Sequence, residues 1–163
     1  MVQKQPCSSG LTTVRFHPDG GLFATGDREG IVSLWDISTQ EEIVKLGEAG
    51  MPVSSLSFSE NGFYLASCGP EDREIKLWDI RKNKVVKNFT LEGESYAEKV
   101  EFDYSGNFLA FSGYNFGILD VRSMSLVKED VIKNGHFTSV KFGNIEDEFM
   151  ISTCSTGELL IHS

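Results

Sequence analysis

The chain has 163 residues, of which 40% are hydrophobic and 24% charged, and its formal net charge is −9. This composition is typical of a globular protein with a sizeable core, and the negative charge argues against direct binding of nucleic acid because it would repel the phosphate backbone. We recognise no signal peptide and no run of roughly 18 apolar residues, so we expect neither secretion nor a membrane partner.

Four segments of the sequence repeat one another. Each contains a phenylalanine at the same place, and these phenylalanines are 42, 44 and 40 residues apart: Phe16, Phe58, Phe102 and Phe142. A fixed period of this length indicates a duplicated structural unit rather than chance. We place the four repeats approximately at 11–46, 53–90, 97–132 and 137–163.

The first repeat reads as four short strands. Val14 and Phe16 alternate with polar neighbours, which is the period of two expected of a strand. A turn follows at 18–20, where a glycine can take a positive φ without steric cost, and then a second apolar run. A third strand ends in Trp35 and Asp36, and a fourth covers 43–46. The repeat therefore predicts one antiparallel sheet of four strands.

The later repeats keep this order with some departures. The second repeat ends its third strand in Trp78 and Asp79, and the third has Leu119 and Asp120 there. The third repeat is also shorter between its shared phenylalanine and this point, which predicts a shortened hairpin. The fourth repeat has His162 in place of the tryptophan.

A period of about 40 to 45 residues with a Trp-Asp pair near the end of a strand is typical of a WD-type β-propeller. We therefore predict an all-β fold, a partial propeller of about four blades with four antiparallel strands each, spanning 1–163. A single blade is too thin to form a core, so its faces must be covered by neighbouring blades.

Several residues are expected to hold the blades together. In WD-repeat families, which the chain resembles, the tryptophan joins a hydrogen-bonded set with a hydroxyl residue and an acidic residue. The second repeat offers Ser67, Asp72 and Trp78, and the first offers Thr25, Glu29 and Trp35. Asp36 and Asp79 recur with the repeat, so we predict that they serve in turns rather than in acid–base chemistry.

The sequence predicts no catalytic, cofactor-binding or metal-binding site. The histidines have no partners at metal-ligand spacing, and no phosphate-binding glycine motif is present. Cys7, Cys68 and Cys154 are odd in number and far apart, so we expect reduced thiols rather than disulfides.

Two runs of residues suggest a particular family. The runs "FSENGFYLAS" from Phe58 and "IKLWDIRK" from Ile75 resemble the C-terminal half of the propeller in the pre-mRNA processing factor 19 family, the U-box ubiquitin ligases of the spliceosome. The resemblance implies a nuclear scaffold in splicing and DNA-damage complexes that binds spliceosomal subunits or ubiquitination substrates. It implies ligase activity only through a U-box that this sequence does not contain. The alternative is a WD-repeat scaffold in an unrelated complex, with a cytoplasmic location.

Partner-binding residues are expected in loops, where side chains are freed from blade packing. Our candidates are Arg28, Arg73, Tyr114 and Phe116, because arginine and aromatic side chains are common interface anchors. Ordinary exposed loop residues are the alternative reading of these four. The acidic run at 146–148 is either a solvated loop or a contact for a basic partner.

WD propellers usually close with seven blades, which needs roughly 290 residues at about 42 per blade. Two ways of covering the exposed blade faces remain open: residues outside this sequence, or a second copy of the chain. We predict that the isolated chain self-associates, because uncovered apolar faces favour association.

Overall fold

A computed structural model describes residues 9–47, 50–70, 72–132, 134–143 and 150–162. These residues form fifteen strands in four separate antiparallel sheets. In the described ranges we find no helix that could cross a membrane. The chain is a partial WD-type β-propeller, as its repeats predict, and we number its four sheets as blades 1 to 4.

Every blade is a meander in which consecutive strands pair. Blade 1 contains β1 (Leu11–Phe16), β2 (Leu22–Asp27), β3 (Val32–Asp36) and β4 (Glu42–Leu46). Blade 2 contains β5 (Ser55–Phe58), β6 (Tyr64–Cys68), β7 (Glu74–Asp79) and β8 (Lys84–Thr90). Blade 3 contains β9 (Ala97–Phe102), β10 (Phe108–Gly113), β11 (Asn115–Asp120) and β12 (Ser125–Val131). Blade 4 has three strands, β13 (Phe137–Phe142), β14 (Met150–Cys154) and β15 (Leu159–His162).

The turn between the first two strands explains why each repeat folds back on itself. Gly20, Gly62 and Gly106 occupy this turn in blades 1 to 3, with φ values of 73°, 70° and 69°. Other L-residues adopt such a φ only with strain, so glycine allows the tight reversal that the sequence predicts. The reversal brings two alternating apolar patterns into register, with Phe16 opposite Phe23 in blade 1 and Phe58 opposite Leu65 in blade 2.

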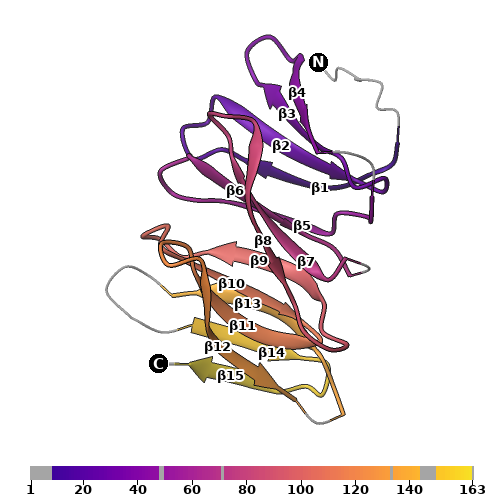
Figure 1. Cartoon of the computed structure of the whole chain (residues 1–163), viewed down its shortest axis with the longest axis vertical. Coiled ribbons are helices and arrows are strands. Elements are labelled where there is room, and N and C mark those ends of the chain that lie inside the picture. The colour runs from indigo at the N-terminus through magenta and orange to yellow at the C-terminus, as the bar shows by residue number, and fades with distance from the viewer. Residues whose placement is uncertain (1–8, 48–49, 71, 133, 144–149, 163) are drawn as a thin grey trace.

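The blades stack one behind another along the molecule, from the indigo blade 1 to the yellow blade 4 (Figure 1). Three apolar cores fill the spaces between them, and each core draws side chains from both adjoining blades. The core between blades 1 and 2 includes Ala24, Val32, Leu34, Leu56, Leu65 and Trp78. The core between blades 2 and 3 includes Ile75, Leu77, Val100, Leu109, Phe111 and Leu119. The core between blades 3 and 4 includes Ala110, Phe116, Phe137, Val140, Met150 and Cys154.

The first strand of a blade also makes polar contacts with the blade that follows. The Thr12 hydroxyl in β1 donates to the carbonyl of Val53, and the Arg15 Nε donates to the carbonyl of Leu56 at 3.0 Å. These bonds cross the first joint, as we call the contact between two consecutive blades. They fix the relative position of blades whose apolar contact alone is not directional.

The second and third joints carry related contacts. Ser54 in blade 2 donates to the carbonyl of Glu98 at 2.7 Å. The hydroxyl of Ser57 accepts the main-chain N–H of Phe102 at 2.9 Å. At the third joint, Lys141 forms an ion pair with Glu101. The side chains of the first strands therefore link all four blades into one body.

Candidate protein-interaction edge

The two tryptophans use the hydroxyl partners that the repeats place beside them. The Trp78 Nε1 donates to the Ser67 hydroxyl at 2.9 Å, and the Trp35 Nε1 donates to the Thr25 hydroxyl at 2.9 Å. All four side chains belong to buried residues. Because a buried indole N–H without an acceptor is costly, these bonds allow a large aromatic ring to sit in the blade packing.

The acidic residues proposed for the same sets make other contacts. Asp72 forms a 2.7 Å ion pair with Lys76 and accepts the main-chain N–H of Glu74 at 3.1 Å. In blade 1 it is Asp27 whose carboxylate accepts the N–H groups of Glu29 and Ile31, at 2.9 and 2.8 Å. Glu29 itself is exposed, so Asp27, which the sequence analysis missed, organises this loop.

The aspartates that end the third strands of blades 1 and 2 hold turns. Asp36 accepts the Ser38 hydroxyl at 2.6 Å and the Thr39 N–H at 2.9 Å, and these bonds lower the pKa of Asp36. Asp79 accepts a 2.9 Å hydrogen bond from the Arg81 guanidinium, and this bond is the main cause of the lowered pKa of Asp79. The lowered pKa values reflect hydrogen bonds that favour the ionised form of both carboxylates.

Blades 3 and 4 replace the tryptophan in different ways. In blade 3 the ring of Phe111 fills the space beside Gly117, and Leu119 stands at the tryptophan position. In blade 4 the His162 ring takes that position, with its Nε2 2.9 Å from the Ser152 hydroxyl. Both substitutes are apolar or aromatic, so each still fills its joint.

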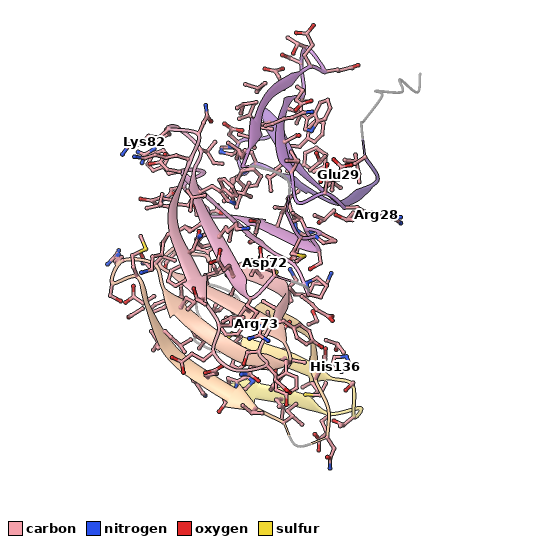
Figure 2. All side chains as sticks on the ribbon, turned by 45° about the vertical axis from the view of Figure 1, so that its right-hand side comes forward. Arg28, Glu29, Asp72, Arg73, Lys82 and His136 are labelled. Carbon is pink, nitrogen blue, oxygen red and sulfur yellow. The ribbon has the colours of Figure 1, made fainter. Side chains whose placement is uncertain are left out.

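The loops that join second to third strands lie along one edge of the stacked blades. Arg28, Asp72 and Arg73 of these loops follow this edge in Figure 2, together with His136 of the segment that joins β12 to β13, whereas Lys82 lies on the opposite edge. This arrangement follows from the meander, because equivalent turns of successive blades come out on the same side. We call the loops 28–31, 72–73 and 113–115 with their neighbours the loop edge.

Arg28 and Arg73 are the exposed cations of the loop edge. The Arg28 backbone is fixed by a 3.0 Å bond from its N–H to the Gly10 carbonyl, and the Arg73 carbonyl accepts the Leu91 N–H at 2.8 Å. Within the described ranges, neither guanidinium forms an ion pair with a carboxylate. Each residue is therefore held by its backbone, and among the described residues its guanidinium has no carboxylate partner.

Tyr114 adds an aromatic ring to the same edge. It is 39% exposed, and its ring lies 6.1 Å from the ring of Tyr96. The Gly113 backbone lies very close to the Tyr96 carbonyl. A β-carbon on Gly113 would come within 2.3 Å of that carbonyl, so glycine is needed for this close approach. The Tyr114 N–H donates to that carbonyl at 3.2 Å. The turn thus presents a tyrosine on a firmly held backbone.

Phe116 does not lie on the loop edge, and our prediction for it is wrong. It belongs to β11, is fully buried, and packs 5.5 Å from Phe137 and 4.4 Å from the His162 ring, measured between ring centroids. The shortened hairpin of blade 3 removes residues from the turn, so the strand has already begun at Phe116. Its role is to fill the third joint.

Some sequence-based expectations concern other residues. The acidic run at 146–148 and Cys7 lie outside the described residues. Cys68 and Cys154 are free and buried, and burial raises the pKa of the Cys68 thiol to about 12. Cys68 is therefore a neutral thiol, which suits packing rather than nucleophilic chemistry. Among the described residues, no cluster of three His, Cys, Asp or Glu side chains is arranged to hold a metal ion.

Comparison with known proteins agrees with the repeated sheets. The family "WD domain, G-beta repeat" matches residues 2–36 and 42–79. The chain is 38% identical over 142 residues to Pre-mRNA-processing factor 19 of Oryza sativa subsp. japonica, a match that covers 82% of the chain and 26% of that protein. It is 34% identical over 139 residues to Pre-mRNA-processing factor 19 homolog 2 of Arabidopsis thaliana, with the same shares covered.

A second group of similar proteins carries a different name. The chain is 33% identical over 91 residues to Small ribosomal subunit protein RACK1z of Arabidopsis thaliana, which covers 56% of the chain and 27% of that protein. The chain thus spans about a quarter of the length of these curated relatives. With its four stacked sheets and its two tryptophan–hydroxyl pairs, the chain is a WD-repeat segment that resembles the pre-mRNA-processing factor 19 proteins.

Proposed function

We propose that this chain is a partner-binding segment of the propeller of a nuclear pre-mRNA splicing factor. The observation that carries the proposal is the 38% identity, over 82% of the chain, with Pre-mRNA-processing factor 19. Proteins of that name from Schizosaccharomyces pombe and Dictyostelium discoideum also match, at 33% and 32% identity. The proposal assigns the chain a binding role and no chemical step.

The loop edge is the surface we assign to partner binding. Arg28 and Arg73 offer guanidinium donors, and Tyr114 offers an exposed ring beside Tyr96. Arginine and tyrosine are enriched among the residues that dominate interface energies, because they combine large contact area with directional hydrogen bonds. The partners we propose are spliceosomal proteins or ubiquitination substrates. Ubiquitin transfer itself would belong to a U-box outside this sequence.

A pull-down with matched variants tests the proposal. The immobilised chain is incubated with nuclear extract, and bound proteins are identified by mass spectrometry. We expect enrichment of spliceosomal proteins, and we expect Arg73→Ala combined with Tyr114→Ala to lower their recovery about tenfold, which corresponds to roughly 1.4 kcal/mol. Lys82→Ala, on the opposite edge, is the control and should leave recovery unchanged. Absence of spliceosomal proteins would contradict the splicing assignment, and equal recovery with the double variant would contradict the loop edge.

The second candidate function is a WD-repeat scaffold in an unrelated cytoplasmic complex. The match to Small ribosomal subunit protein RACK1z supports it, although this match covers a smaller share of the chain. Sedimentation of a cell extract through a sucrose gradient separates the two candidates. Migration of the tagged chain with small ribosomal subunits supports the alternative, whereas migration with spliceosomal complexes supports the splicing assignment.

A further inference from the structure

The first observation concerns the face of blade 1 that points away from blade 2. Val14 and Phe16 are 52% and 68% exposed there. Val14 pairs with Thr25 in blade 1, and Leu56 pairs with Ser67 in blade 2. Leu56 in β5 is therefore the counterpart of Val14 in β1. Leu56 is fully buried in the first joint. Blade 1 therefore presents, to solvent, the same kind of face that blade 2 buries against blade 1.

The second observation concerns the opposite end of the stack. Leu159 and Ile161 of β15 are 60% and 68% exposed. Ile161 pairs with Ile151 in blade 4, and Leu77 pairs with Ala66 in blade 2. By this register Ile161 is the counterpart of Leu77, and Leu159 is the counterpart of Ile75 in β7. Ile75 and Leu77 are both fully buried in the second joint. Blade 4 thus presents the face that a following blade would cover.

The third observation is a hydrogen-bonding pattern that blade 4 leaves half complete. Thr12 and Ser54 each contact a carbonyl of their own blade and also a carbonyl of the next one. Thr138 occupies the equivalent place in β13 and contacts the Thr153 carbonyl of its own blade at 3.2 Å. Its other contact is the Thr153 hydroxyl at 2.8 Å, also within blade 4, and no described residue supplies a carbonyl from a following blade. Thr138 therefore stands where Thr12 and Ser54 reach the next blade, with only its own blade as a partner.

We propose that two copies of this chain associate head to tail, with the outer face of blade 4 in one copy packed on the open face of blade 1 in the other. The apolar contact would join Leu159 and Ile161 to Val14 and Phe16, and Thr138 would face a carbonyl at the start of β1. The chain itself supplies the template, because its first and second joints are made by the equivalent residues. This argues for a WD blade as the occupant, and a second copy provides the required face.

Symmetry gives the pair a definite form. A head-to-tail contact is heterologous, and such contacts produce either a closed ring or an open chain. Two copies with two equivalent contacts form a ring of eight blades, which is within the range of closed propellers. The proposal concerns the blade faces and is independent of the loop edge, so either proposal can fail without the other.

Light scattering coupled to size-exclusion chromatography tests the association. At micromolar concentration, we expect the chain to elute with twice the mass of one copy. Phe16→Asp and Ile161→Asp each place a carboxylate in both contacts of the ring, so each should weaken association by about a hundred-fold or more. Val127→Asp is the control, because Val127 is 59% exposed on β12 of blade 3 and belongs to neither blade 1 nor blade 4. A monomeric unmodified chain, or dissociation by Val127→Asp, would overturn the proposal.

Mixing the two variants tests the head-to-tail geometry. A Phe16→Asp copy retains an intact blade 4 face, and an Ile161→Asp copy retains an intact blade 1 face. One intact contact can therefore form in the mixture, and we expect mixed dimers that neither variant makes alone. Mixed dimers would also show that both variants are folded. If Ile161→Asp alone remains dimeric, or if the mixture stays monomeric, the head-to-tail contact is wrong.

Discussion

The ring of Phe111 lies against Gly117 so closely that a β-carbon on Gly117 would come within 2.4 Å of it. In blade 2 the corresponding place on β6 holds Ser67, which pairs with Lys76 and accepts the Trp78 indole. In blade 3 the large ring, Phe111, comes from the second strand, whereas in blade 2 the large ring, Trp78, comes from the third strand. The large ring and the missing side chain compensate each other across the strand pair.

Gly117→Ala is therefore expected to destabilise the chain by about 1–3 kcal/mol, because the added methyl group overpacks the second joint. The measurement is the free energy of unfolding from urea titration. Gly21→Ala is the matched control, since Gly21 is exposed and a β-carbon there meets only the Asp19 side chain, at 3.4 Å or beyond. An unfolding free energy unchanged by Gly117→Ala would contradict this account of blade 3.

Ser67→Ala should cost about 1–3 kcal/mol, because it leaves the buried Trp78 N–H without its 2.9 Å acceptor. Thermal unfolding followed by tryptophan fluorescence measures the effect and also reports on the indole. Ser67→Thr keeps the hydroxyl and should retain more of the stability than Ser67→Ala. If the two variants are equally destabilised, the hydrogen bond is not the cause.

Phe116→Ala and Tyr114→Ala should separate packing from binding. Phe116 is fully buried, so its truncation leaves a cavity at the third joint and should cost about 3–5 kcal/mol. Tyr114 is 39% exposed in a turn, and its truncation should cost less than about 1 kcal/mol. Chemical denaturation of both variants checks this difference. A small effect of Phe116→Ala would argue against its place in the core.

The stability of the chain should fall as the pH is lowered from about 6.5, because of His162. Burial lowers the pKa of this ring below its usual 6.5, Lys128 lowers it further, and Asp130, 4.0 Å from Nδ1, raises it. The unfolded chain therefore binds the proton at a higher pH than the folded chain does. The stabilisation is present above pH 6.5 and is lost as the pH falls through the folded pKa.

Urea titrations between pH 7.5 and 5.5 measure this dependence. His162→Gln removes the titrating ring and should flatten the decline in this range, which lies above the usual pKa values of carboxylates. The loss of stacking on Phe116 should lower the stability of this variant at every pH. The same decline in the variant and in the unmodified chain would show that His162 is not responsible.

The repeats predicted the blades well, because the alternation of apolar residues, the turn glycines and the Trp-Asp pairs are all local signals. Two details depended on information that is not local. Phe116 reads as a loop residue from the shortened spacing of its repeat, but Tyr114 alone fills the turn, and Phe116 already pairs with Ser112. Glu29 reads as the acidic loop residue, but the carboxylate of Asp27 reaches two loop N–H groups directly.

The repeat pattern also could not predict which apolar residues are exposed at the ends of the stack. Val14 and Leu56 share a register position and an apolar character, yet one is half exposed and the other fully buried. The difference arises from whether another blade lies on that face. The sequence of one repeat does not show whether another blade covers its face, so the burial of such a residue is known only from the structure.

Four side-chain hydrogen bonds, those of Thr12 and Arg15 at the first joint and of Ser54 and Ser57 at the second, run in one direction. In each of the four the side chain comes from the earlier blade, and the later blade contributes a main-chain N–H or C=O group. Any residue except proline can offer both groups, so the later blade is free to vary its first strand without losing these contacts. Duplicated or exchanged blades could therefore be tolerated downstream of an unchanged one, which gives this architecture a built-in route for shuffling repeats during evolution and in design.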